Sequence, residues 1–95
     1  MSDKSLMIIA KFIARPGKAD ELQTVLSRCI EPSRAEAGCL YYDLYRSLDD
    51  QNTFLFHEGW HSQAALDRHG EQPHFTRLLA DAADMLQQLP EIIVK

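Results

Sequence analysis

The sequence has no cluster of basic residues and no apolar run long enough to cross a bilayer. Its ten Lys and Arg residues are scattered singly among fourteen Asp and Glu residues, which gives a net charge of -4. Nucleic-acid binding needs clustered positive charge to displace counterions, so this composition argues against a nucleic-acid partner. A membrane-spanning helix needs roughly 20 apolar residues, and the N-terminal apolar stretch is interrupted too soon, at Lys11, for a signal peptide. We therefore expect a cytoplasmic protein without a membrane partner.

Cysteine is also scarce, with two residues in the chain. Cys29 falls in a predicted helix and Cys39 opens a predicted strand, and nothing in the sequence indicates an oxidising compartment. We expect two free and largely buried thiols.

The length of 95 residues allows one hydrophobic core, so we expect a single domain over residues 1–95. Hydrophobic residues make up 45% and charged residues 25% of the chain, as in an ordinary globular protein. There is no internal repeat, low-complexity tract or linker.

The first half of the chain predicts a strand followed by an amphipathic helix. Residues 6–14 are rich in β-branched and apolar types, which favours a strand. A turn at residues 15–17 follows, and then apolar residues recur at helical spacing: Ala19, Leu22, Val25, Leu26, Cys29 and Ile30. We expect Pro32 to end or kink this helix near Glu31, and Gly38 to close the region.

The second half predicts a hairpin, two helices and a final strand. Residues 39–46 and 53–60 are aromatic-rich and alternate, with a loop of about five residues between them. Ser62 is a good N-cap for a short helix over residues 63–68. A longer helix, with Phe75, Leu78, Leu79, Ala82 and Leu86 on one face, should run until Pro90, and residues 91–95 should form a short strand.

The predicted order is β-α-β-β-α-β, which is typical of a ferredoxin-like α+β fold. Its antiparallel sheet carries the helices on one face. Several strands are apolar or aromatic on both sides, so the uncovered face needs a second apolar surface. We expect a homodimer that buries this face.

The stretch His57-Glu58-Gly59-Trp60-His61 matches the H-E-x-x-H pattern of zinc metalloproteases. That pattern needs a helix, whereas these residues end a predicted strand, on which positions four apart stand roughly 13 Å from each other. We therefore predict no zinc site of this type. A looser metal site that combines some of His57, His61, His69 and His74 remains an alternative.

Strand alternation places Glu58 on one face with Phe54, Phe56 and Trp60. A carboxylate in line with three aromatic residues lies either at the rim, in a surface ion pair, or in a pocket. The pocket interpretation would make Glu58 a functional residue, because site chemistry often uses a partly buried acid.

Several motifs together resemble the antibiotic biosynthesis monooxygenase family. They are Pro16-Gly17, Glu36-x-Gly38-Cys39-Leu40-x-Tyr42, Glu58-x-Trp60, Ala65-Leu66-x-x-His69 and Pro73-His74-Phe75. The resemblance covers nearly the whole chain and implies a dimeric ferredoxin-like fold. Family members with known activity include cofactor-independent oxygenases of quinols and polycyclic phenols, and isomerases of small autoinducer-derived sugars.

The oxygenase hypothesis implies a small aromatic substrate, dioxygen and no cofactor or metal. It needs an apolar pocket and a base that titrates near neutrality, for which His69 is the best candidate. We assign catalytic roles to His69 and Glu58, and substrate binding to Trp60, Tyr42, His74 and Phe75. The structural alternatives are a helix-terminal His69, core or interface aromatics for Trp60 and Tyr42, and a structural His74.

Two other functions remain open on the sequence. Some oxygenating relatives carry an Asn near the end of the third strand, where this chain reads Phe54-Leu55-Phe56-His57 and has Asn52 only in the loop. The chain could instead be an isomerase of a small (phospho)sugar-like compound, with Lys11 and Arg46 lining the pocket. It could also be a dimeric small-molecule binder without turnover.

Overall fold

The computed structural model describes residues 4–95, so the first three residues of the predicted domain lie outside the described part of the chain. The elements in chain order are β1 (Leu6–Ile13), α1 (Ala19–Ser27), α2 (Ile30–Arg34), β2 (Cys39–Arg46), β3 (Thr53–Trp60), α3 (Gln63–Gly70), α4 (Pro73–Ala82), a 3-10 turn (Ala83–Met85) and β4 (Glu91–Val94).

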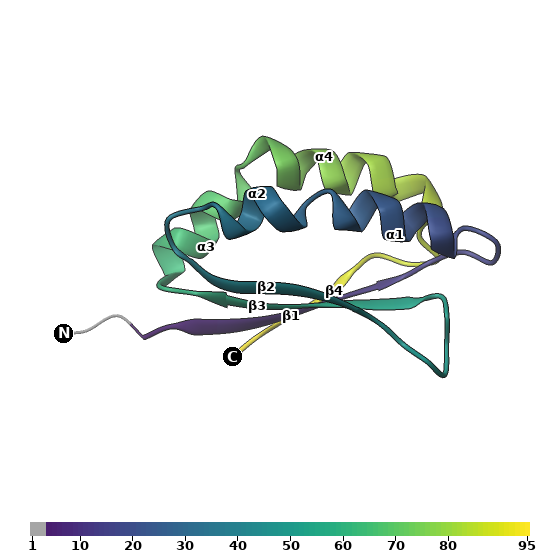
Figure 1. The fold of residues 1–95 in the computed structure, drawn as a ribbon, viewed down its shortest axis with the longest axis horizontal. Coiled ribbons are helices and arrows are strands. Elements are labelled where there is room, and N and C mark those ends of the chain that lie inside the picture. The colour runs from purple at the N-terminus through teal and green to yellow at the C-terminus, as the bar shows by residue number, and fades with distance from the viewer. Residues whose placement is uncertain (1–3) are drawn as a thin grey trace.

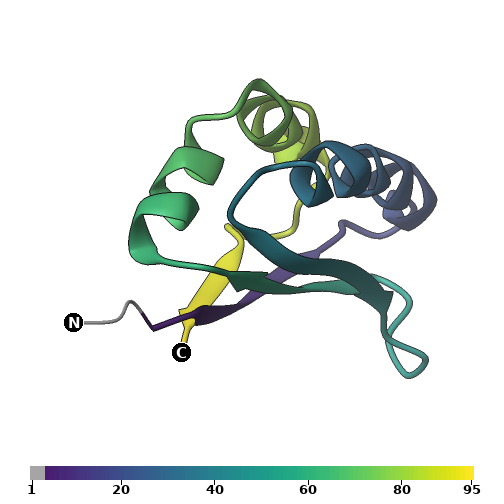
Figure 2. The same ribbon diagram turned by 60° about the vertical axis from the view of Figure 1, so that its left-hand side comes forward.

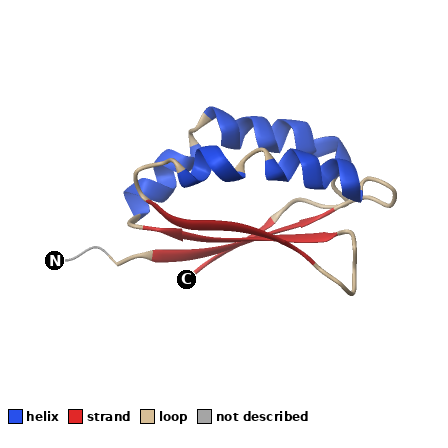
Figure 3. Ribbon diagram, viewed as in Figure 1, coloured by secondary structure: helices blue, strands red, loops and turns tan. Residues whose placement is uncertain are grey.

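The strands form one antiparallel sheet in the order β2-β3-β1-β4, and the helices all lie on one of its faces (Figures 1 and 3). Helix α4 lies beside α1 above the sheet (Figure 2). This arrangement confirms the predicted ferredoxin-like α+β fold.

Strand alternation decides which side chains the helices cover. In the register of β1 and β3, Phe12 lies opposite Phe54, Ala10 opposite Phe56, and Ile8 opposite Glu58. All six side chains are buried, because this face of the sheet lies against the helices. The alternation predicted for the third strand is thus confirmed.

The first helix breaks earlier than predicted. Helix α1 ends at Ser27, and Pro32 lies inside the first turn of α2 rather than at its end. The reason is that a proline ring clashes with the carbonyl four residues before it, here Arg28, and has no N–H to bond it. A proline in a first helical turn meets no such conflict, so the break falls at residues 28–29.

The last two helices also differ from the prediction at their ends. Helix α3 continues to Gly70, two residues beyond Arg68, while Ser62 caps its start by accepting a hydrogen bond from the Ala65 N–H at 3.2 Å. Helix α4 ends at Ala82, well before Pro90. The chain is drawn back to the sheet there, because Leu86 bridges Ala14 and the Gln87 N–H donates to Ile13 at 2.9 Å.

Both cysteines are free thiols, as predicted; Cys29 is buried and Cys39 is half-buried. Within residues 4–95, no helix has the length and apolar character needed to cross a membrane.

Replacing a residue between the helices and the sheet should lower the free energy of unfolding. Leu26 is fully buried on α1, so we expect Leu26→Ala to cost about 2–5 kcal/mol, measured by urea unfolding. Leu48, in the hairpin loop, is 92% exposed, and Leu48→Ala should leave the midpoint nearly unchanged. Equal losses in the two variants would contradict this position of the core.

Candidate functional site

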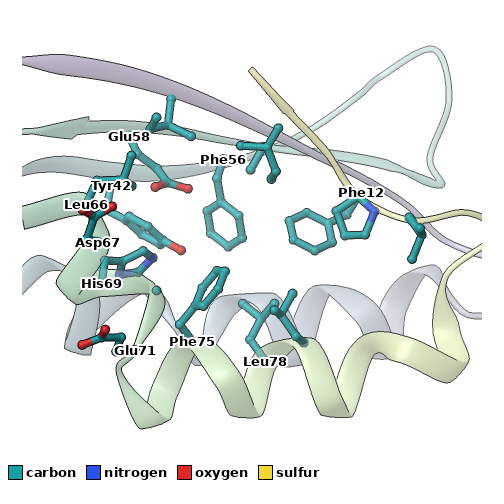
Figure 4. A pocket seen from close by; sticks show the side chains of 17 residues that line it. Phe12, Tyr42, Phe56, Glu58, Leu66, Asp67, His69, Glu71, Phe75 and Leu78 are labelled. Carbon is teal, nitrogen blue, oxygen red and sulfur yellow. The ribbon is translucent and has the colours of Figure 1, made fainter. Parts of the chain in front are cut away.

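A cavity of about 890 Å³ lies between the sheet and the helices (Figure 4). Its floor is the helix-covered face of the sheet, where Ala10 on the central strand has a small side chain between Phe56 on β3 and Ile92 on β4. Aromatic and aliphatic side chains make up most of its wall. The polar lining residues are Glu58, Asp67, His69 and Glu71, which lie toward α3 in Figure 4.

Glu58 faces this cavity and is only 4% exposed, which rules out the surface ion pair. Its Oε1 accepts a hydrogen bond from the Trp60 indole N–H at 2.9 Å. Burial raises the pKa of Glu58 to about 7, although the bond from Trp60 acts in the opposite direction. The carboxyl group can therefore both hold and release a proton near neutral pH.

His69 lies near the end of α3 and is 3% exposed. Its Nδ1 is 2.7 Å from Glu36 Oε2, and its Nε2 has no hydrogen-bond partner among the described residues. Burial lowers the pKa of His69, with Glu36 opposing the change. A neutral His69 that bonds a carboxylate through Nδ1–H keeps a free lone pair on Nε2.

Three aromatic residues hold the His69 ring in place. The ring centroids of Trp60, Phe75 and Tyr42 lie 4.5, 4.9 and 5.5 Å from that of His69. Tyr42 and Phe75, two of the residues assigned to substrate binding on the sequence, also line the cavity. The Tyr42 hydroxyl lies 3.6 Å from Cys29 Sγ, and burial raises the pKa of Tyr42 well above its usual range, so the phenol stays neutral.

Trp60 and His74 do not line the cavity, which corrects the predicted position of both. Trp60 is fully buried behind Glu58 and His69, and its N–H is already used by Glu58. His74, at the start of α4, lies beyond Glu36 and bonds Glu36 Oε2 through Nε2 at 2.7 Å. Both residues reach the cavity only through a neighbour.

The histidines of the H-E-x-x-H stretch lie apart from this site. The stretch continues β3 to Trp60, as predicted; His57 packs on Tyr41 with ring centroids 4.8 Å apart, and His61 is exposed. The histidines that come together are His69 and His74, joined by Glu36.

Sequence reasoning assigned no role to Glu36. The residue lies in the short connection between α2 and β2, where neither helical nor strand periodicity applies. The motif Glu36-x-Gly38-Cys39 was the one sequence signal that included it.

The fold and this partly open cavity are those of a ferredoxin-like protein with room for a small molecule. The sequence model of the antibiotic biosynthesis monooxygenase family matches residues 5–81, and the chain belongs to this family.

Similarity to individual proteins supports this family assignment. Rv0793 of Mycobacterium tuberculosis is 40% identical over 83% of this chain and 77% of its own, and its solved structure superposes with a TM-score of 0.91 over 97% of this chain and 93% of that one. PA3566 of Pseudomonas aeruginosa superposes with a TM-score of 0.93 at 38% identity, over 100% and 95% of the two chains. The Synechocystis sp. protein sll1783 is 34% identical over 96% of this chain, which spans 62% of the length of that relative.

The buried carboxyl group of Glu58 should make stability fall as the pH rises. The folded state keeps the proton up to about pH 7, whereas the unfolded chain releases it near pH 4.5. Glu58 therefore does not lower the free energy of unfolding below pH 4.5, and it lowers it increasingly as the pH rises from 4.5 to 7. Relative to Glu58→Gln, which can still accept the Trp60 bond, the wild type should lose about 3 kcal/mol across this window. Urea unfolding at pH 4 to 8 measures the difference.

The control for this experiment is Glu31→Gln, which alters a carboxylate that is 85% exposed on α2. Its stability should follow the wild type at every pH. A Glu58→Gln profile parallel to the wild type would contradict a buried, proton-holding Glu58.

Proposed function

We propose that the protein is a cofactor-independent monooxygenase that oxidises a quinol or phenolic aromatic small molecule with dioxygen. The observation that carries this proposal is His69 Nε2, which has no hydrogen-bond partner within residues 4–95 and lies in the wall of an apolar cavity that also contains Glu58. Membership of the antibiotic biosynthesis monooxygenase family supports it, as does the provisional monooxygenase name of Rv0793.

In this mechanism His69 and Glu58 both return to their starting state. His69 Nε2 removes the hydroxyl proton of the substrate, and the electron-rich phenolate passes one electron to dioxygen. The two radicals combine to form a C–O bond, and protonated Glu58 gives its proton to the outer peroxide oxygen.

The remaining step releases water. Glu58 takes the proton from the ring carbon that carries the hydroperoxide, a C=O bond forms, and the O–O bond breaks. The hydroxide that leaves takes the proton from His69. A hydroquinone and O₂ thus give a hydroxyquinone and H₂O, with one oxygen atom in each product and the substrate as the source of all electrons.

The lining favours an aromatic substrate over a phosphorylated one. A cavity of about 890 Å³ can hold a drug-sized ligand, and its ionisable lining residues are acids and a histidine rather than Lys or Arg. Lys11 pairs with Glu91 at 3.9 Å and Arg46 with Asp20 at 3.1 Å, and neither lines the cavity. This arrangement disfavours the isomerase alternative, because carboxylates repel a phosphate group.

We also propose that the protein works as a homodimer in the cytoplasm. The sheet face opposite the helices carries Tyr45 and Ile93, which are 54% and 48% exposed, beside Ile9 and Leu55. A second copy could bury this apolar face. The free thiols of Cys29 and Cys39 fit a reducing compartment.

Sedimentation velocity tests the dimer. We expect twice the chain mass of 10.8 kDa for the wild type and one chain mass for Ile93→Glu, which places a charge on this face. Glu31→Gln on α2, at the other face of the sheet, should leave the mass of the assembly unchanged. A monomeric wild type at micromolar concentration would exclude the proposal.

Oxygen uptake tests the activity. Chelator-treated protein should consume oxygen faster than autoxidation with at least one member of a hydroquinone and naphthol panel. His69→Ala should slow this reaction about 10²- to 10⁴-fold, because it removes the base.

The matched control is His61→Ala, which removes an exposed histidine outside the cavity and should keep the rate. Full activity in His69→Ala would eliminate His69 as the base. Saturable ligand binding without oxygen uptake would favour the non-catalytic binder.

A further inference from the structure

One carboxylate oxygen joins two histidines beside the cavity. Glu36 Oε2 lies 2.7 Å from His69 Nδ1 and 2.7 Å from His74 Nε2. We propose that Glu36, anchored by His74, is a positioning residue that holds His69 in the Nδ1–H tautomer and stabilises the imidazolium that forms when Nε2 takes a proton. The catalytic consequence rests on the proposed function, whereas the tautomer does not.

The chemistry of the three groups fixes the direction of both bonds. An ionised carboxylate only accepts hydrogen bonds, so each ring nitrogen next to Oε2 must carry the proton. In a neutral His69 this leaves Nε2 unprotonated, and Nε2 is the atom without a partner among the described residues. The bond to Glu36 therefore determines which nitrogen is available as the base.

The distances favour this hydrogen-bonded chain over a metal centre. Two ligands that bind one zinc ion at about 2.0–2.1 Å in tetrahedral geometry stand about 3.3 Å apart. The nitrogen and oxygen atoms here lie 2.7 Å apart, which is the length of a charge-assisted hydrogen bond.

The backbone around Glu36 is built to hold its side chain against α3. The Glu36 N–H donates to Ser33 and the Cys39 N–H donates to Glu36, both at 3.1 Å. A Cβ atom on Gly38 would collide with the Cβ of Ala65, one helical turn before His69. Because Gly38 has no side chain, α3 can approach this connection closely enough for His69 to reach Glu36.

The Glu36–His74 end of the hydrogen-bonded chain lies near a second, smaller hollow. Glu36 and His74 line this hollow of about 420 Å³ together with Arg68 and Gln72. The Glu36 side chain is 13% exposed and the His74 side chain is 18% exposed. His69, at 3% exposure, lines only the inner cavity. The Glu36 carboxylate thus lies between the buried imidazole of His69 and the partly exposed imidazole of His74.

The two neighbours of His69 act on its charge in opposite directions. Glu36 favours the protonated ring, and His74 disfavours it. The other titratable groups of the cavity wall near His69 are Tyr42 on β2, Glu58 on β3, and Asp67 and Glu71, two residues before and after His69. Substitutions of Glu36 and His74 should therefore shift the titration of His69 with opposite signs.

Long-range ¹H–¹⁵N NMR of histidine-labelled protein tests the proposal without a substrate. In the wild type at neutral pH, we expect the proton of His69 on Nδ1. Glu36→Gln, which retains an acceptor but loses the charge, should lower the pKa of His69 by about 1–3 units, and His74→Gln should raise it. Glu31→Gln, on the preceding helix, should have no effect.

Several results would overturn the proposal: a wild-type proton on Nε2, a titration unaffected in both Glu36→Gln and His74→Gln, or one bound metal ion per chain that Glu36→Gln removes. The wild-type tautomer decides the matter even if a variant does not fold. If oxygen uptake fails while the tautomer and shifts are as expected, the monooxygenase proposal alone is lost. If uptake succeeds, Glu36→Gln should lower kcat more than it changes KM.

Discussion

A carboxyl group that shares a strand face with three aromatic residues cannot lose its proton as easily as one in water. Glu58 is in this position because β3 alternates with period two and the helices cover one face of the sheet. The single hydrogen bond from Trp60 offsets only part of the cost of burying the charge. Glu58 can therefore hold its proton near neutral pH in the same cavity wall as a second titratable group, His69.

The same apolar surroundings act on His69 with the opposite consequence. Burial disfavours the charged form of both groups, so it raises the pKa of Glu58 and lowers the pKa of His69. Under the proposed function, these two groups would serve as an acid and a base in one cavity. The pair depends on distant backbone features, because α3 carries His69 and its approach to the α2–β2 connection requires the bare backbone of Gly38.

The sequence was sufficient where periodicity determines the position of a side chain. Strand alternation predicted the shared face of Phe56 and Glu58, and the helix spacing and fold order followed from the same kind of pattern. The predicted helix end near Glu31 was wrong by a few positions, because Pro32 disrupts the turn before it and the break falls at residues 28–29. Glu36 was missed and Trp60 and His74 were misplaced, because contacts between a loop, a strand end and a helix start depend on tertiary packing.

The walls of the cavity differ along its length. Glu58, Asp67, His69 and Glu71 gather toward α3, whereas Phe12 and Leu78 lie toward the other end (Figure 4). With the indole N–H of Trp60 already used by Glu58, few polar atoms remain to hold a ligand in a set direction. The proposed aromatic ligand would therefore place its more polar part toward α3 and its more apolar part toward Phe12 and Leu78.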